Sequence, residues 1–300
     1  MRHARSLIEW SGTAKPGAPQ RATVVLIMPK SGQKPRDQGQ LERAVGTLML
    51  RLFSLRKKET HRLAEAPAGN RLYVVGDIHG RLDLLLRLYD KIAEDARKEP
   101  AGDRHIFYLG DYVDRGPSSR EVLEFLMNRP QSGFPAIHLR GNHEAMMLQF
   151  LEDSSIGPEW FAYGGLATLM SYGVNLKAEG KPEQKLAAAQ RVLNENLPES
   201  HKAFLRGLPT YASAGDYFFV HAGVRPGIPL ERQTDSDLIW IRDEFLDSQD
   251  FHGKIVVHGH SYRTEPEVRP NRIGIDTGAY ATGRLTCLVL EGPGMRFLTT

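Results

Sequence analysis

Five short stretches of this 300-residue sequence combine glycine with side chains that can bind metal ions or transfer protons. They are "GDIHG", "GDYVDRG", "GNHE", "VHAGV" and "HGH". They contain carboxylate, amide and imidazole ligands but no thiolate, and the metal-binding candidates are Asp77, His79, Asp111, Asn142, His221 and His260. Mixed oxygen and nitrogen ligation suits Mn²⁺, iron or Zn²⁺ better than Ca²⁺ or a soft metal.

The number of these candidates predicts two metal ions rather than one. Six ligands are too many for a single tetrahedral Zn²⁺. Two ions about 3.5–4 Å apart share such a set in two-metal phosphatases, and a carboxylate such as Asp111 can bridge both. A solvated turn would explain one of the stretches, because Asp and Gly are common turn residues. It does not explain five of them, each directly after an apolar run.

The apolar runs before these stretches have the composition of β-strands. In the first half of the chain, segments with helical spacing follow three of them, at 80–97, 119–128 and 144–153. Strand–loop–helix alternation predicts βαβ units and a largely parallel sheet. Because ligand sites form at the carboxyl ends of such strands, we expect the candidates at one edge of the sheet.

The second half is expected to begin with helices and to end in strands. Residues 157–208 have a helical pattern, which is clearest in "KPEQKLAAAQRVLNENL", and we interpret them as an insertion or cap. Strands are predicted at "DYFFVHAGV", "KIVVHGH", "NRIGIDTG" and "RLTCLVLEG".

The N-terminal region differs in composition from the rest. Residues 1–70 hold 13 Lys and Arg against 5 Asp and Glu, so a basic region precedes a mildly acidic one. We expect a basic, disordered tail over 1–68 and a catalytic domain over 69–300, with the helical insertion at about 151–208. Residues 41–64 could form a basic amphipathic helix, either as a solvated leader or as a contact to a membrane surface or partner.

Met49 resembles a natural start of translation, so we interpret residues 1–48 as an upstream over-extension of the reading frame. The intact mass of the native protein tests this interpretation.

Composition also excludes several classes of function. An acidic domain argues against nucleic-acid partners, which need a basic face. The sequence contains no run of eighteen apolar residues, so we expect no transmembrane segment. The single cysteine, Cys287, fits a reducing cytosol and a buried position in a strand, so we expect a cytoplasmic protein. His201 and His252 are expected at the surface.

The five stretches, in this order, resemble the motifs of the calcineurin-like metallophosphoesterases, and especially the bacterial and bacteriophage-type phosphoprotein phosphatases. The resemblance covers residues 71 to about 291. It implies an α/β fold with a two-layered β-sheet sandwich, flanking helices and a dimetal site at the carboxyl ends of the strands. Many members of the superfamily end in Gly-His-x-His, whereas Tyr262 stands at the last position here. The phosphoprotein phosphatase branch also lacks that histidine.

The resemblance implies a role for each candidate ligand. Asp77, His79 and Asp111 would hold the first metal ion. The second would be held by a set that shares one carboxylate with the first: Asp111, Asn142, His221 and His260. We expect Mn²⁺, with iron or Zn²⁺ as alternatives. A register two residues earlier would make His258 the ligand, but His260 follows a glycine as in the family motif.

The resemblance also implies the catalytic groups. Asp114 would pair with His143 and fix its tautomer, and His143 would protonate the leaving alkoxide. Arg115 and Asn142 would bind the phosphate oxygens. Arg242 is the candidate for a second arginine, and its alternative is a helix-surface residue. A hydroxide that bridges the two metal ions would attack phosphorus in line, without a phosphoenzyme.

Three functions are compatible with these residues. The favoured one is a serine/threonine protein phosphatase that acts on a phosphoprotein or a small phosphoester. A symmetrical diadenosine tetraphosphate hydrolase would share every metal motif. A non-enzymatic scaffold is disfavoured, because the ligands, His143 and Asp114 are all present. The segment "WFAYGGLATLMSYG" resembles one in bacterial and bacteriophage-type protein phosphatases, and we interpret it as a subgroup marker rather than as chemistry. The sequence leaves the oligomeric state open.

Overall fold

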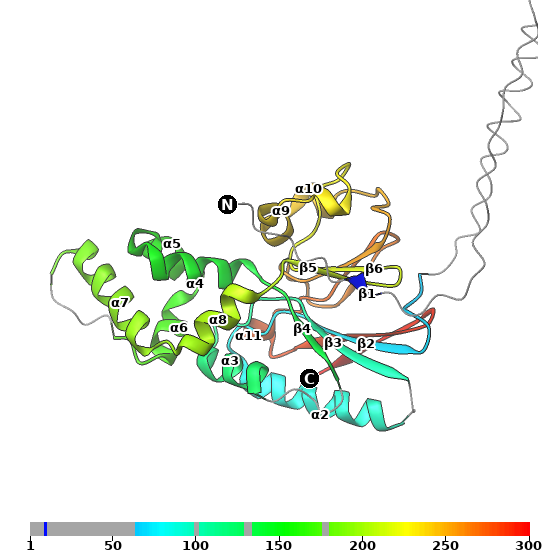
Figure 1. Cartoon of the computed structure of the whole chain (residues 1–300), viewed down its shortest axis with the longest axis horizontal. Coiled ribbons are helices and arrows are strands. Elements are labelled where there is room, and N and C mark those ends of the chain that lie inside the picture. The colour runs from blue at the N-terminus through cyan, green and yellow to red at the C-terminus, as the bar shows by residue number, and fades with distance from the viewer. Residues whose placement is uncertain (1–8, 11–63, 99–101, 129–133, 176–179) are drawn as a thin grey trace, which may run out of the picture. The chain divides into compact units, whose positions relative to one another are not determined.

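Two β-sheets pack face to face, and helices cover the outer face of each (Figure 1). The computed structural model describes residues 9–10, 64–98, 102–128, 134–175 and 180–300. The two-layered α/β sandwich expected from the sequence is confirmed. The amphipathic helix predicted at 41–64 and most of the predicted tail lie outside the described residues. Within that tail, Ala66 is buried.

The first sheet contains the strands that precede the first three motifs. Its order is β11-β10-β2-β3-β4, with β2, β3 and β4 parallel and β10 antiparallel to both β2 and β11. The strands are β2 (Asn70–Val75), β3 (Asp103–Tyr108), β4 (Ala136–His138), β10 (Thr286–Glu291) and β11 (Gly294–Thr299).

The second sheet contains the strands that precede the two histidine motifs. Its order is β1-β5-β6-β7-β9-β8, and β6, β7 and β9 are parallel. The strands are β1 (Glu9–Trp10), β5 (Tyr211–Ala214), β6 (Tyr217–Val220), β7 (Ile255–His258), β8 (Glu267–Val268) and β9 (Arg272–Gly274). The predicted strands are therefore present, and they divide between two sheets as the family resemblance implies, whereas strand–helix alternation alone predicts one largely parallel sheet.

Both faces of the central strands are buried, which explains their nearly continuous apolar composition. In β2, Tyr73 and Val75 face the helices, and the alternate residues Leu72 and Val74 face the second sheet. Between the sheets, the rings of Phe107 and Phe219 stack at 4.3 Å. Cys287 is buried in β10, as predicted.

Helices flank the sandwich on its two outer faces (Figure 1). Those that pack against the first sheet are α2 (Leu82–Lys98), α3 (Ser119–Asn128) and, at its end, α11 (Ala279–Thr282). Those beside the second sheet are η2 (Leu230–Arg232), α9 (Asp235–Trp240) and α10 (Asp243–Leu246). None of the helices in the described ranges is long and apolar enough to cross a membrane.

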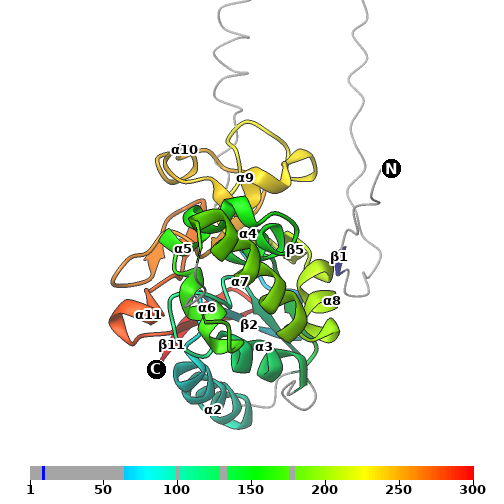
Figure 2. The same cartoon turned by 90° about the vertical axis from the view of Figure 1, so that its left-hand side faces the viewer.

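A group of helices lies between β4 and β5 in the chain and covers one end of the sheets (Figure 2). It consists of α4 (Asn142–Glu152), η1 (Ser154–Ile156), α5 (Gly157–Ala162), α6 (Gly165–Ser171), α7 (Pro182–Asn196) and α8 (Glu199–Gly207). The surface position expected for His201 is wrong. This side chain is buried, and its Nδ1 is 2.7 Å from the Tyr172 hydroxyl, so a hydrogen bond compensates for its lost hydration.

Candidate metal centre

The six candidate ligands come from five strand ends and lie together where the two sheets meet. Three of these ends belong to the first sheet and two to the second. Asn142 is the first residue of α4, so it projects from the helix start toward the site. All six side chains are at most 7% exposed: Asp77, His79, Asp111, Asn142, His221 and His260.

Two groups of side chains could each hold a metal ion, and they share Asp111. One group is Asp111, His221 and His260, and the other is His79, Asp111 and His143. The Asp111 Oδ2 atom lies 3.5 Å from His79 Nε2 and 3.3 Å from His221 Nε2. This carboxylate therefore lies within reach of histidines from both groups.

The hydrogen bonds of His221 support a cation at this position. The Leu109 carbonyl can only accept, so His221 Nδ1 donates to it at 2.9 Å. The neutral ring then presents a lone pair at Nε2. Two oxygen acceptors face that lone pair, Asn142 Oδ1 at 2.9 Å and the Asp111 carboxylate at 3.3 Å, and His260 Nδ1 lies 3.2 Å away. Converging acceptors need a proton or a metal ion between them.

Without a metal ion, a proton is the group that neutralises this cluster. Burial opposes a charge on His221, but Asp111 and Asp77 outweigh it and raise the pKa of His221 to about 9. A divalent cation would replace that proton and satisfy the same acceptors. The donor set therefore fits metal binding.

His79 is oriented in the same way. Its Nδ1 donates to the Val113 carbonyl at 2.9 Å, so a lone pair at Nε2 faces the site. Burial lowers the pKa of His79 well below its usual range, which favours the neutral ligand form. Arg115 Nη1 donates to that Nε2 at 2.8 Å.

Asp77 lies beside the His260 main chain and belongs to neither of the two ligand groups. The His260 N–H donates to Asp77 Oδ2 at 3.0 Å. A Cβ atom on Gly259 would lie 2.0 Å from Asp77 Oδ1, so only glycine fits there. Burial, followed by the nearby Asp276 carboxylate, raises the pKa of Asp77 well above its usual range. Sequence reasoning missed Asp276, whose "IDTG" context gave only a strand signal.

Backbone strain is concentrated at the predicted site. Among the described residues, the non-glycine positions with positive φ are His79 at 46°, Asp111 at 54°, Asp114 at 71°, Arg115 at 65° and His260 at 62°. Such conformations cost about 1–3 kcal/mol each and persist where the surrounding structure holds them. All five are residues that the sequence singled out for ligation or catalysis.

Asp114 and His143 form the buried pair predicted from the sequence. The His143 Nδ1 atom lies 2.7 Å from Asp114 Oδ2, and both side chains are at most 1% exposed. Burial opposes protonation of His143, but Asp111 and Asp114 outweigh it and raise its pKa. By distance alone His143 also qualifies as a ligand, with Nε2 3.8 Å from Asp111 Oδ2. Metal analysis of His143 variants separates the two roles.

Glu144 is a residue that sequence reasoning missed, although it completes "GNHE". Its fully buried carboxylate accepts main-chain N–H groups from Asp111 at 2.8 Å, Tyr112 at 2.7 Å, Val113 at 3.3 Å and Gly141 at 2.9 Å. Burial raises the pKa of Glu144 to about 7. This side chain therefore ties the turn after β3 to the start of α4.

The predicted phosphate-binding arginines differ in their surroundings. Arg115 is half-buried and lies 4.6 Å from the Tyr280 ring centroid, while that ring packs edge-on against His79 at 5.4 Å. Arg242 is exposed at the start of α10, and its positive charge helps to lower the pKa of His260, although burial is the larger cause. His258 lies outside both ligand groups. Its Nδ1 is 3.0 Å from the Gly259 carbonyl.

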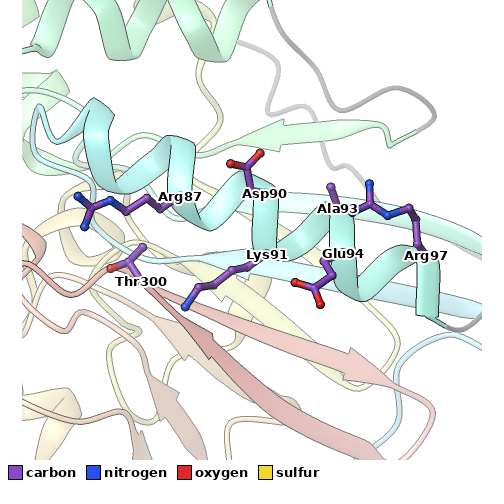
Figure 3. A pocket seen from close by; sticks show the side chains of 7 residues that line it. All are labelled: Arg87, Asp90, Lys91, Ala93, Glu94, Arg97 and Thr300. Atoms are coloured by element: carbon purple, nitrogen blue, oxygen red, sulfur yellow. The ribbon is translucent and has the colours of Figure 1, made fainter.

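A hollow on the surface of α2 is unrelated to this cluster (Figure 3). Its side chains carry charges of both signs, and they include Arg87, Asp90, Lys91, Glu94, Arg97 and Thr300. None of the candidate ligands lies in it.

The family of the chain follows from comparison with known proteins. The profile of the calcineurin-like phosphoesterases matches residues 70–288. The chain belongs to this family. Together with the buried ligand groups, membership makes it a phosphoester hydrolase that depends on divalent metal ions.

The names of its relatives refer to more than one kind of substrate. Serine/threonine-protein phosphatase 1 of Salmonella typhimurium is 29% identical over 240 residues, which are 77% of this chain and 97% of that protein. The symmetrical bis(5'-nucleosyl)-tetraphosphatase of Aromatoleum aromaticum is 30% identical over 160 residues, which are 53% of this chain and 46% of that protein.

A solved structure described provisionally as a diadenosine tetraphosphatase is similar in fold. It has a TM-score of 0.53 and 21% identity, and it covers 79% of this chain and 98% of that one. At this identity the likeness bears on the fold alone.

Proposed function

We propose that the chain is a phosphomonoesterase of the serine/threonine protein phosphatase type. The observation that carries the proposal is the buried Asp114–His143 pair, whose imidazole lies beside Asp111, the carboxylate that the two ligand groups share. An alkoxide from a seryl or threonyl side chain is a poor leaving group, so a positioned acid contributes strongly to its departure. The similarity to a serine/threonine phosphatase across nearly the whole of that protein supports this choice.

The proposed roles follow the positions of the side chains. Asp77, His79 and Asp111 would hold one divalent ion, and Asp111, Asn142, His221 and His260 would hold the other. The ions would supply Lewis acidity and activate water near neutral pH. We propose Mn²⁺, because the ligands are carboxylate, amide and imidazole.

The remaining groups would act on the substrate. Arg115 and Arg242 would bind phosphoryl oxygens, together with Asn142, and hold the phosphorus in place. His143 would pass a proton from Nε2 to the leaving oxygen, while Asp114 keeps the proton on Nδ1. Asp114 would thereby stabilise the charged ring before transfer.

The alternative is symmetrical hydrolysis of diadenosine tetraphosphate, which the name of the Aromatoleum relative favours. Its leaving group is a nucleotide phosphate that departs without strong acid assistance. A proton donor as deeply buried as His143 is therefore less needed for that reaction.

The test is a substrate panel on metal-stripped protein reloaded with Mn²⁺. It contains nitrophenyl phosphate, phosphoserine, phosphothreonine and phosphotyrosine peptides, and diadenosine tetraphosphate. Rapid turnover of phosphoserine and phosphothreonine peptides, with little attack on the dinucleotide, supports the proposal. Rapid release of nucleoside diphosphate moves the assignment to the alternative, and a panel left intact with both ions bound rejects enzymatic hydrolysis of these substrates.

A further inference from the structure

The Asp114 carboxylate is held by two side chains from the helical insertion. Its Oδ2 atom accepts the Trp160 indole N–H at 2.9 Å, in addition to the contact with His143. Its Oδ1 atom accepts the Thr168 hydroxyl at 2.6 Å. Trp160 and Thr168 are fully buried, so no water replaces either donor.

Thr168 contacts the main chain of the same residue as well. The Asp114 N–H lies 2.9 Å from Thr168 Oγ1 and 3.0 Å from Ser119 Oγ, and the two hydroxyl oxygens are 3.0 Å apart. Because a hydroxyl has one proton, Thr168 donates to the carboxylate, and Ser119 donates to Thr168. The Thr168 hydroxyl therefore donates its proton to the Asp114 carboxylate, and its oxygen accepts from the Asp114 N–H and from the Ser119 hydroxyl.

The insertion also sets the next residue of the turn. The Arg115 N–H donates to the Gly164 carbonyl at 3.2 Å. A Cβ atom on Gly164 would lie 2.9 Å from the Arg115 nitrogen, and the φ of 105° at Gly164 favours glycine as well. Asp114 and Arg115 both have positive φ, and these contacts hold the strained turn in place.

We infer that Trp160 and Thr168 are positioning residues for proton delivery. They fix both oxygens of Asp114, and Asp114 fixes the His143 ring, so the insertion between β4 and β5 is part of the catalytic machinery. This inference rests on the proposed phosphomonoesterase function. It goes beyond the interpretation of "WFAYGGLATLMSYG" as a subgroup marker, since both donors come from that segment.

The inference predicts a dependence on the leaving group that a merely structural role would not produce. A group that must be protonated as it leaves needs a well-oriented His143, whereas nitrophenolate leaves readily as an anion. Losing one hydrogen bond to a charged acceptor corresponds to a loss of about 10- to 100-fold in a rate that depends on that bond. We therefore expect Thr168→Val to lower kcat by that factor for a phosphoserine peptide and by only about 2- to 3-fold for nitrophenyl phosphate.

The experiment measures kcat and KM of the Mn²⁺-loaded full chain on nitrophenyl phosphate, phenyl phosphate and a phosphoserine peptide. Thr168→Ser keeps the hydroxyl and should restore turnover of the peptide. Thr210→Val removes a matched hydrogen bond from a threonine to a carboxylate, the one to Asp235, and should leave all three rates unchanged. If Thr168→Val does not fold, Trp160→Phe decides the question by the same leaving-group comparison.

The outcomes separate this inference from the function on which it rests. Equal losses on all three substrates, or no loss, in the Thr168 and Trp160 variants overturn the inference while the function stands. His143→Asn serves as the reference, since its loss should depend most steeply on the leaving group. If that variant loses rate equally on every substrate, the acid role of His143 is wrong and the inference falls with it.

Discussion

Replacing Glu144 by glutamine should destabilise the fold strongly, although the side chain keeps its size. The carboxylate accepts four main-chain N–H groups, two on each oxygen: Asp111 and Gly141 on Oε2, Tyr112 and Val113 on Oε1. A glutamine amide has one acceptor oxygen and one NH₂ group. In either orientation, the NH₂ group faces two buried donors and leaves both unpaired.

The magnitude follows from these two lost bonds. A buried polar group left without a partner costs about 1–3 kcal/mol, so two of them cost about 2–6 kcal/mol. The free energy of unfolding of a typical domain is only about 5–15 kcal/mol, so the loss is a large fraction of the total. The protonated form of Glu144, which its pKa of about 7 makes accessible, keeps more of these bonds than glutamine does.

Urea unfolding at neutral pH, followed by circular dichroism, measures the change. Glu152→Gln is the matched control, because Glu152 is exposed near the end of the same helix and its replacement should change stability by less than about 0.5 kcal/mol. If Glu144→Gln costs no more than this control, the carboxylate does not hold the turn and the reasoning is refuted.

Three further perturbations test the site and its surroundings. His143→Asn should lower turnover by about 10²- to 10⁴-fold with the metal content unchanged, whereas Asp111→Ala should lose metal. Loss of both ions from the His143 variant would show that this ring is a ligand. Gly259→Ala should reduce metal affinity, because the added Cβ would lie 2.0 Å from Asp77 Oδ1, and unchanged metal content would contradict that steric reasoning. Burial lowers the pKa of His138 from 6.5 to about 4 in the folded protein. As the pH falls, the unfolded chain therefore protonates His138 at a higher pH than the folded protein does. Stability should therefore fall by up to about 3 kcal/mol as pH drops from 6.5 to 4, and His138→Phe should flatten that fall in acid unfolding curves.

The sequence by itself determined the strands and the residues that follow them. Runs such as "LYVV" and "IFYL" have no charged residue to place on a solvated face, which is typical of strands buried on both sides. Asp77, His79 and Asp111 follow such runs directly, so their position at a strand end could be read from spacing alone. Local signals of this kind depend only on neighbours in the chain.

Only the tertiary structure decided which distant residues meet. The strands divide between two sheets, so His221 and His260 reach Asp111 from the opposite layer of the sandwich. Trp160 and Thr168 lie in segments with an ordinary helical pattern, and nothing near them in the sequence identifies Asp114 as their partner. A hydrogen bond at a separation of 46 or 54 residues is set by packing, not by local preference. The sequence therefore specified the candidate metal-binding groups, and the fold alone supplied what holds Asp114 and the turn in place.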